Sequence, residues 1–335
     1  MITTVDYHTA GEPFRIVTGG APEIPGATVL QRREHAMTGE ADRIRALLCN
    51  EPRGHADMYG CFLVPPDGAP DGAVLGALFW HKDGFSTACG HGTIALGAYA
   101  VDEGLVTAPD DGEVDVVVDV PSGRVTARVS RAAGRTRSVA FRNVPAYVLA
   151  RTVSVPTSLG DIRVDVSYGG AIYASARAAD VGLAVDPVHL TDLISLGRQI
   201  RDALNATDVG RHPSEPRLSG VYGTIWFDDL GGTPGGGHQR NCTVFADGEV
   251  DRSPCGSGTS ARLALLHADG LLRTGADLRH DSIVGTTFLA RVVEEVTAGG
   301  RPAVVTEVKG NAFRTGRHSF ELDPHDPLGE GFQLR

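Results

Sequence analysis

The sequence has no apolar run of about eighteen residues, so it offers no candidate for a membrane-spanning helix. It also lacks a block of Lys and Arg, and its 31 basic and 41 acidic residues give a formal net charge of −10, which argues against nucleic acid as a partner. The first residues contain neither the basic region nor the apolar region typical of a secretory signal, so none is expected. These absences predict a cytoplasmic protein without membrane or nucleic-acid partners.

Cysteine is scarce and irregularly spaced. The set is odd in number and contains no Cys-x-x-Cys pair; its members are Cys49, Cys61, Cys89, Cys242 and Cys255. This pattern argues against structural zinc and against a disulfide framework, and it fits a reducing cytoplasm. We expect no metal site, and we interpret Cys49, Cys61 and Cys242 as small buried hydrophobic residues.

A composition of 41% hydrophobic and 21% charged residues is typical of a soluble globular protein. A chain of 335 residues is long for one core, which predicts two domains. We expect a first domain of residues 1–120 closed by about 318–335, because a strand at Phe320–Asp323 could cross back to it. Residues 121–317 form the expected second domain.

The alternation of apolar and polar residues, together with turns marked by Gly and Pro, predicts many strands and few helices. The expected helices cover 29–48, 90–103, 186–205 and a segment that begins after Cys255. The expected strands are 2–7, 14–18, 61–64, 73–81, 114–120, 123–129, 139–143, 147–155, 162–168, 221–227, 241–245, 282–295 and 303–308. The glycine-rich stretch 231–237 lacks the Lys-Ser/Thr pair of a phosphate-binding loop, so we interpret it as a connector.

Two cysteines stand in a repeated pattern. When Cys89–Val106 is laid over Cys255–Leu272 without gaps, eight of eighteen positions match, including both Cys-Gly-x-Gly-Thr runs. An internal duplication explains this match, and it predicts that each half places one cysteine at a helix N-terminus. Open amides and the helix dipole there favour a thiolate and a bound carboxylate.

If the two halves face each other, one thiolate could remove an α-proton while the opposing thiol protonates the other face. This inverts a stereocentre without a cofactor, provided that amides stabilise the charge that develops on the carboxylate. Three further groups of residues each allow a structural and a functional interpretation. His91 is either a loop histidine or part of the anion-binding turn, Asp251 either a turn residue or a ligand for the substrate ammonium. Glu51, Arg53 and His55 either brace a loop or serve function.

Together these segments resemble the proline racemase superfamily. The matching motifs extend over essentially the whole chain and are His8–Pro13, Glu51–His55, Cys89–Gly92, Asn143–Pro145, Tyr168–Gly170, Asp251–Gly256 and Asp323…Leu328. The resemblance implies an α+β protein of the diaminopimelate epimerase-like fold: two pseudo-symmetric α/β domains, each a sheet wrapped around a central helix, with the active site between them. It implies that Cys89 and Cys255 are the catalytic acid/base pair.

By the same resemblance, Gly90, His91, Gly256 and Ser257 bind the substrate carboxylate, and Asp251 acts with His91 on the ring nitrogen. The implied substrate is free proline or a hydroxyproline, with no cofactor. A homodimer is the assembly considered, and the oligomeric state stays open.

The branch of the superfamily is ambiguous from the sequence. Dehydratases of trans-3-hydroxy-L-proline generally carry threonine at the second cysteine, so Cys255 favours a racemase or epimerase. The stretches Asp57–Gly60, Tyr168–Tyr173 and Tyr222–Ile225 look more like the dehydratase branch. We therefore predict a cofactor-independent racemase or epimerase that inverts Cα by two-base transfer. Trans-3-hydroxy-L-proline dehydratase and a catalytically silent amino-acid-binding protein are the alternatives.

Overall fold

A computed structural model describes residues 1–68, 72–232 and 236–334. The chain divides into two compact units, which we call unit 1 (Met1–Val139 with Asn311–Arg335) and unit 2 (Ala140–Gly310). The sequence placed this division at residue 120. The structure keeps the next hairpin strand in unit 1, because β6 (Gly112–Val120) and β7 (Gly123–Ala132) pair along their whole length.

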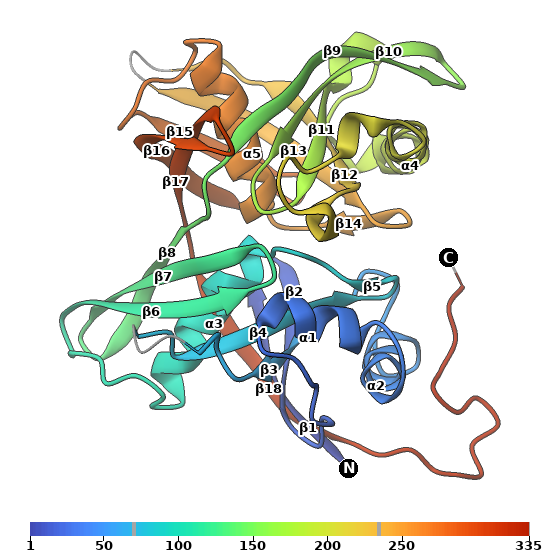
Figure 1. Ribbon diagram of the computed structural model, residues 1–335, viewed down its shortest axis with the longest axis vertical. Coiled ribbons are helices and arrows are strands. Elements are labelled where there is room, and N and C mark those ends of the chain that lie inside the picture. Colours follow the sequence, from blue (N-terminus) through green and yellow to red (C-terminus); the bar gives the residue numbers. More distant parts are fainter. Residues whose placement is uncertain (69–71, 233–235, 335) are drawn as a thin grey trace. The chain divides into compact units, whose positions relative to one another are not determined.

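Unit 1 is a mixed sheet with one buried helix and two outer helices (Figure 1). Its remaining strands are β1 Ile2–Thr9, β2 Glu12–Gly19, β3 Gly60–Val64, β4 Leu75–His81, β5 Gly84–Phe85 and β18 Ala312–Phe320. Its helices are α1 Val29–Ala36, α2 Glu40–Cys49 and α3 Gly90–Asp102. Strand β8 (Arg135–Arg142) crosses the division between the units.

Unit 2 is also a mixed sheet with one buried central helix. Its strands are β9 Tyr147–Thr157, β10 Gly160–Tyr168, β11 Ile172–Arg177, β12 Val221–Asp229, β13 Gly237–Phe245, β14 Glu249–Asp251, β15 Asp277–Ser282, β16 Thr287–Ala298 and β17 Arg301–Gly310. Its α-helices are α4 Leu190–Asn205 and α5 Gly256–Ala268, and its short 3₁₀ turns are Ala178–Val181, Pro187–His189, Asp208–Gly210 and Pro216–Leu218.

The strand pairing of the two units follows one pattern. In unit 1 the order β18-β1-β2-β3-β4-β6-β7 runs antiparallel, antiparallel, parallel, antiparallel, parallel, antiparallel. In unit 2 the order β9-β10-β11-β12-β13-β15-β16 repeats that series. The parallel steps fall where helices connect the strands, as parallel pairing requires. This repetition supports the internal duplication inferred from the two cysteine segments.

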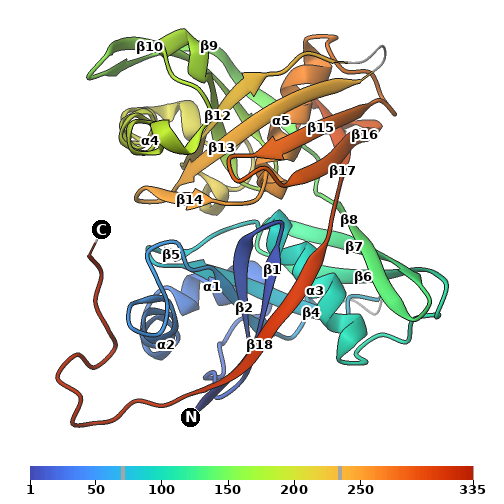
Figure 2. The same cartoon turned by 180° about the vertical axis from the view of Figure 1, so that it is seen from behind.

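The central helix of each unit is buried on all sides. Strands β1, β2, β6, β7 and β18 pack around α3, and β9, β10, β11, β16 and β17 pack around α5. Figure 2 shows β1, β2 and β18 side by side, so the last strand closes the unit that the first strand begins. A crossing strand is therefore present, but it covers Ala312–Phe320, so the strand expected at Phe320–Asp323 was placed wrongly and shares only Phe320 with it.

Two further element predictions are wrong. The helix expected over 29–48 is two helices, because Gly39 takes φ 82° and interrupts the helical backbone between α1 and α2. The strand expected over 282–295 begins later, because a turn at Ser282–Thr286, with Gly285 at φ 84°, separates β15 from β16. The connector predicted at 231–237 includes residues 233–235, which lie outside the described residues, and its last residue begins β13.

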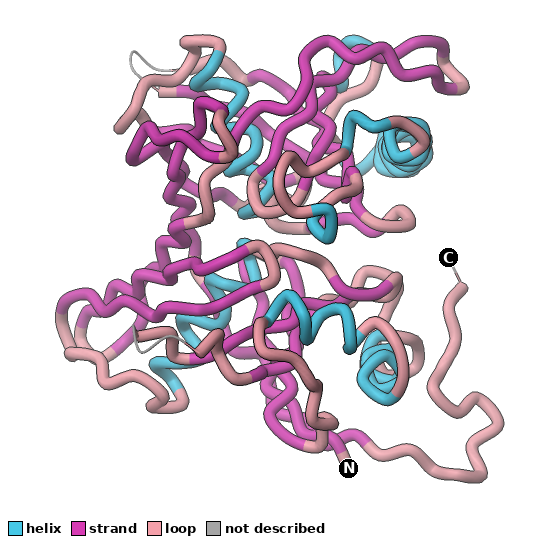
Figure 3. The backbone as a smooth tube through the Cα atoms, in the orientation of Figure 1, coloured by secondary structure: helices cyan, strands magenta, loops and turns pink. Residues whose placement is uncertain are grey.

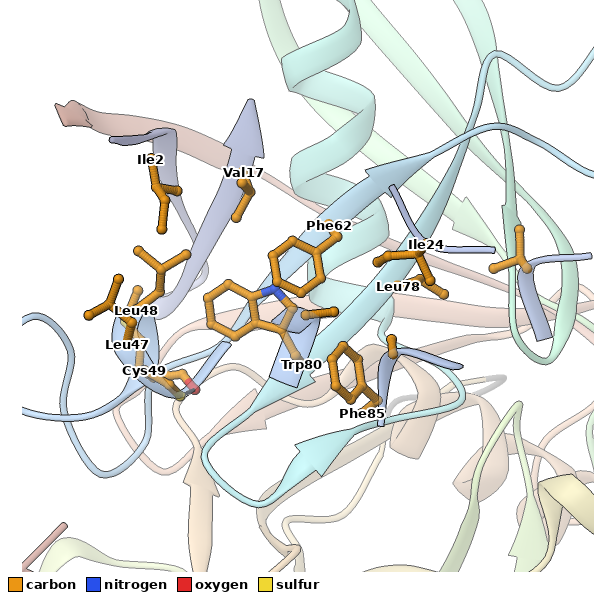
Figure 4. Packing of buried hydrophobic residues seen from close by; sticks show 14 residues of the cluster. Ile2, Val17, Ile24, Leu47, Leu48, Cys49, Phe62, Leu78, Trp80 and Phe85 are labelled. Carbon is orange, nitrogen blue, oxygen red and sulfur yellow. Dashed lines mark hydrogen bonds between the residues drawn. The ribbon is translucent and has the colours of Figure 1, made fainter. Parts of the chain in front are cut away.

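The outer helices of unit 1 cover an apolar cluster on one face of its sheet. Figure 4 shows Trp80 beside Phe62, with Leu47 and Leu48 of α2 on one side and Phe85 on the other. Burial of such side chains contributes roughly 1.5–3 kcal/mol each, so this layer anchors the strands that lead to α3. Strands dominate both units (Figure 3), and among the described residues no helix has the length and apolar character that a membrane crossing demands.

Candidate active site

Cys89 lies at the start of α3, as predicted, and acts as its N-cap. Its backbone is extended (φ −153°, ψ 105°), and its Sγ accepts a hydrogen bond from the Gly92 N–H at 3.2 Å. The same sulfur lies 3.5 Å from both ring nitrogens of His91. An amide and an imidazole beside one sulfur are groups that stabilise a thiolate.

His91 is held in place by aromatic rings. Phe14 and Tyr59 meet its imidazole edge-on, with centroids 5.7 Å and 4.8 Å away. Its carbonyl accepts a hydrogen bond from Thr9 Oγ1 at 2.9 Å. The histidine is buried, so its ring orientation beside Cys89 is fixed by packing from β2 and from the segment before β3.

Gly92 is required by close contacts. A Cβ at this position would lie 2.4 Å from Phe14 Cε2 and 2.7 Å from Cys89 Sγ. Gly258 has the matching place in α5, where a Cβ would lie 2.9 Å from Cys255 Sγ. The shared Cys-Gly-x-Gly spacing thus lets the amide of the fourth residue approach the sulfur in both units.

Cys255 begins α5 with a different backbone. It takes φ 61° and ψ 102°, a region that non-glycine residues rarely occupy, and its side chain caps no amide. Its Sγ lies 3.9 Å from the Tyr173 hydroxyl, which is hydrogen-bonded to Ser257 Oγ at 2.8 Å. The predicted residues Cys255, Gly256 and Ser257 therefore share one small site with a tyrosine from β11.

Asp251 orders the loop that leads to Cys255. Its Oδ1 accepts hydrogen bonds from the Ser253 N–H and Ser253 Oγ, at 2.8 Å and 2.7 Å. Ser253 Oγ in turn accepts the Cys255 N–H at 3.0 Å. These contacts support the turn interpretation of Asp251, while its second carboxylate oxygen takes no part in them.

Burial sets the ionisation of Cys255. The loss of solvent raises the pKa of its thiol well above the usual range, and the Asp251 carboxylate raises it further. The Gly258 amide and the side chains of Thr243 and Tyr173 near the sulfur lower this pKa without cancelling the effect of burial. The helix N-terminus was expected to favour a thiolate, but burial outweighs it here and Cys255 is a thiol. Burial also raises the pKa of the core residue Cys242 to about 12.

The charged cluster at Glu51 and Arg53 braces the C-terminal segment. Glu51 forms two backbone hydrogen bonds with Phe332, and Arg53 lies 3.6 Å from Asp326. His55 lines a small cavity in the same region. The motifs at 51–55 and 323–328 thus contact each other within unit 1, which supports the bracing interpretation.

The structure sorts the predicted site residues into two groups, one in each unit. Cys89, Gly90 and His91 start α3, while Asp251, Cys255, Gly256 and Ser257 surround the start of α5. Tyr173 was not predicted. The only sequence signal was its place at the end of the Tyr168–Tyr173 motif, since strand periodicity does not reveal a contact with Cys255 eighty-two residues away.

The proline racemase family model matches residues 4–333 of this chain. The chain belongs to the proline racemase family. It is 41% identical over 332 residues to trans-3-hydroxy-L-proline dehydratase of Bacillus cereus, covering 99% of this chain and 98% of the relative. It is 44% identical over 340 residues to 3-hydroxyproline 2-epimerase of Burkholderia multivorans, covering 100% and 98%.

A hydroxyproline epimerase from Agrobacterium vitis, solved with bound trans-4-hydroxy-L-proline, has a similar structure. It superimposes with a TM-score of 0.90 at 31% identity, covering 99% of this chain and 95% of the other. The predicted α+β fold of the diaminopimelate epimerase type is therefore confirmed, and so is the predicted enzyme class, an enzyme of the proline racemase family.

Proposed function

We propose that this enzyme inverts Cα of a proline-type amino acid, a 3-hydroxyproline above all, by proton transfer between Cys89 and Cys255. The observation that carries the proposal is that each cysteine is the N-cap residue of the central helix of its unit. The duplicated architecture thus supplies two acid/base groups of the same kind. Two relatives named for 3-hydroxyproline support the choice of substrate.

In this mechanism one sulfur removes the α-proton as the Cα–H bond breaks, and the electron pair spreads into the carboxylate. The other thiol then gives its proton to the opposite face of Cα, so the two sulfurs exchange protonation states in each turnover. General acid–base groups of this kind contribute typically about 10²–10⁴-fold to the rate.

The two sulfurs start from different states. Burial keeps Cys255 protonated, which makes it the proton donor of the resting enzyme. Cys89 accepts an amide hydrogen bond and contacts His91, which suits the base. The substrate enantiomer whose α-proton faces Cys89 is then the first to react.

The remaining predicted residues hold the substrate. We propose that Gly90 with His91, and Gly256 with Ser257, present amides to the carboxylate oxygens at the helix starts, where the dipole favours an anion. Asp251 and His91 would hold the ring nitrogen. Such amides matter because removing one donor to a developing oxyanion typically costs about 10²–10³ in rate.

A second candidate is dehydration of trans-3-hydroxy-L-proline, which the name of the Bacillus cereus relative favours. Here one sulfur removes the α-proton and returns a proton to the 3-hydroxyl as the C–O bond breaks, so that water leaves and the resulting enamine tautomerises to a cyclic imine. Only one base is needed on the α-proton, so this reaction does not explain the second cysteine.

A substrate panel in D₂O separates the candidates. Proline, trans-4-, cis-4- and trans-3-hydroxyproline are followed by polarimetry, by NMR at Cα and by trapping of imine with o-aminobenzaldehyde. We expect inverted product with deuterium at Cα. Imine from trans-3-hydroxyproline without inverted product of any substrate would establish the dehydratase instead.

The same experiment tests the catalytically silent alternative. A binding protein would be stabilised against thermal unfolding by one of these amino acids, yet it would exchange no α-proton. Exchange or inversion of any substrate removes that alternative.

A further inference from the structure

A buried histidine stands behind the loop that carries Cys255. His280 of β15 is fully buried, and its ring bridges two side chains. Nε2 lies 2.8 Å from Asn241 Nδ2, and Nδ1 lies 2.8 Å from Thr259 Oγ1. Three elements, β13, β15 and α5, thus meet at one imidazole.

Both partners of His280 also bind the carbonyl of Pro254. Asn241 Nδ2 donates to Pro254 O at 2.8 Å, and Thr259 Oγ1 donates to the same oxygen at 3.0 Å. This carbonyl belongs to the peptide group that precedes Cys255. On the other side of that peptide, the Cys255 N–H donates to Ser253 Oγ.

One peptide plane is therefore fixed at both ends, and the orientation of this plane sets φ at Cys255. The value of 61° is disfavoured for a residue with a side chain by roughly 1–2 kcal/mol, so it persists only where neighbouring groups impose it. The clamp on the Pro254–Cys255 peptide supplies that constraint and directs the sulfur toward Tyr173.

The hydrogen-bond directions leave one arrangement for the imidazole. Thr259 Oγ1 gives its only proton to Pro254 O, so it accepts from Nδ1–H of His280. Asn241 Nδ2 gives one proton to Pro254 O and the other to His280 Nε2, which must then carry a lone pair. The ring is neutral in this arrangement, in agreement with burial, which lowers the pKa of His280 to about 3.

We propose that His280 is a positioning residue for Cys255: through Asn241 and Thr259 it fixes the peptide that aims the sulfur at the substrate. This role rests on the proposed function, because it concerns the cysteine that inversion needs and elimination does not. A sulfur displaced by about 1 Å can cost about 10²-fold in rate.

The test compares His280→Leu and His280→Gln with Thr306→Val. Leucine fills the site without polar atoms, and glutamine restores a donor and an acceptor. Thr306 donates to Ser260 Oγ of α5 at 2.8 Å, whereas the hydrogen bonds to Pro254 O come from Asn241 and Thr259, so Thr306→Val controls for loss of a buried hydrogen bond. Circular dichroism verifies that each variant is folded.

Two rates are measured for each variant: inversion, and α-deuterium exchange from each enantiomer. Cys89→Ser and Cys255→Ser identify which enantiomer each sulfur deprotonates. For His280→Leu we expect kcat for inversion to fall about 10²-fold, whereas exchange from the enantiomer that Cys89 deprotonates stays at the rate of the unmodified enzyme. His280→Gln should recover most of the inversion rate, and Thr306→Val should leave both rates unchanged.

Inversion at the unmodified rate in His280→Leu overturns the proposal, and so does an equal fall of both exchange rates, which indicates a general structural role. If His280→Leu does not fold, Thr259→Val decides instead, because it removes the hydroxyl through which His280 reaches Pro254 O: it must lower inversion selectively, and unchanged rates in it would overturn the role. If the unmodified enzyme inverts no substrate, the proposed function itself fails, and the role of His280 fails with it.

Discussion

The starts of α3 and α5 have the same sequence pattern but different surroundings. Cys89 has an ordinary extended backbone, caps the helix through its sulfur and contacts an imidazole. Cys255 has a left-handed φ, caps nothing with its sulfur and lies beside a tyrosine hydroxyl. Duplication of a helix start therefore preserves where a sulfur is placed, while the neighbouring strands decide its protonation state.

In the proposed inversion this asymmetry has a chemical use. Two identical thiolates could each remove a proton, but neither could supply one. A pair with one sulfur held as a thiol and the other contacted by donors begins each cycle with an acid and a base already assigned.

Substitution of either cysteine should have the largest effect. Cys89→Ser and Cys255→Ser should each lower inversion by about 10²–10⁴-fold, because a serine hydroxyl is a much weaker acid than a thiol. Each variant should keep α-deuterium exchange from one enantiomer only, and the two should keep opposite ones, as measured by NMR in D₂O. If both variants keep exchange from the same enantiomer, the two sulfurs do not serve opposite faces.

Alanine at the fourth position of each Cys-Gly-x-Gly run should destabilise both units, and unit 1 more. A Cβ on Gly92 would meet Phe14 as well as Cys89, whereas a Cβ on Gly258 would be closest to its own sulfur at 2.9 Å. Overpacking of this kind costs about 1–3 kcal/mol, offset in part by the better helix propensity of alanine. Urea unfolding measures the difference. Gly68→Ala is the control, because a Cβ there meets nothing within 4 Å.

The buried thiols should make stability fall at alkaline pH. Burial raises the pKa of Cys255 and of Cys242 in the folded state, so their contribution is complete below the unfolded pKa near 9 and is lost as pH rises above it. At pH 10 each thiol accounts for about 1.4 kcal/mol of this loss. Cys255→Ala should reduce the alkaline slope of the free energy of unfolding as much as Cys242→Ala does. A slope unchanged by Cys255→Ala would mean that Cys255 is not held as a thiol.

A single substitution makes α5 more like α3. Arg262 lies where α3 has Leu96, donates to Gln239 Oε1 at 3.0 Å and stacks 3.8 Å from the Phe227 ring centroid. Arg262→Leu should lower the free energy of unfolding by about 1 kcal/mol, because Gln239 then loses its partner in the core. The double variant Arg262→Leu with Gln239→Leu should recover most of this, as measured by urea unfolding. A double variant no more stable than Arg262→Leu alone would show that the loss of the Gln239 hydrogen bond is not what destabilises the single variant.

Much of the fold could be predicted because its signals are local. The cysteine-led helix starts, the strands around them and the return of the chain to unit 1 follow from glycine placement, alternation and the repeated motif. Two of the errors arose where a glycine with positive φ interrupts a predicted element: Gly39 splits one predicted helix, and the turn containing Gly285 shortens one predicted strand. A Cβ on either glycine would meet nothing within 4 Å, so these left-handed backbones are local breaks, which a search for apolar periodicity does not register.

The sequence by itself determined which residues stand at the two helix starts, because Cys-Gly-x-Gly-Thr is a contiguous pattern with a local backbone reason. Only the tertiary structure decided what surrounds the sulfurs. Tyr173 and His280 reach the Cys255 loop from β11 and β15. The protonation of Cys255 depends on burial, which is the sum of contacts from strands distant in the chain. Ionisation is a property of the folded environment, so one Cys-Gly-x-Gly-Thr pattern, with His91 or Ser257 at its variable position, begins with a capped sulfur beside an imidazole in unit 1 and with a buried thiol in unit 2.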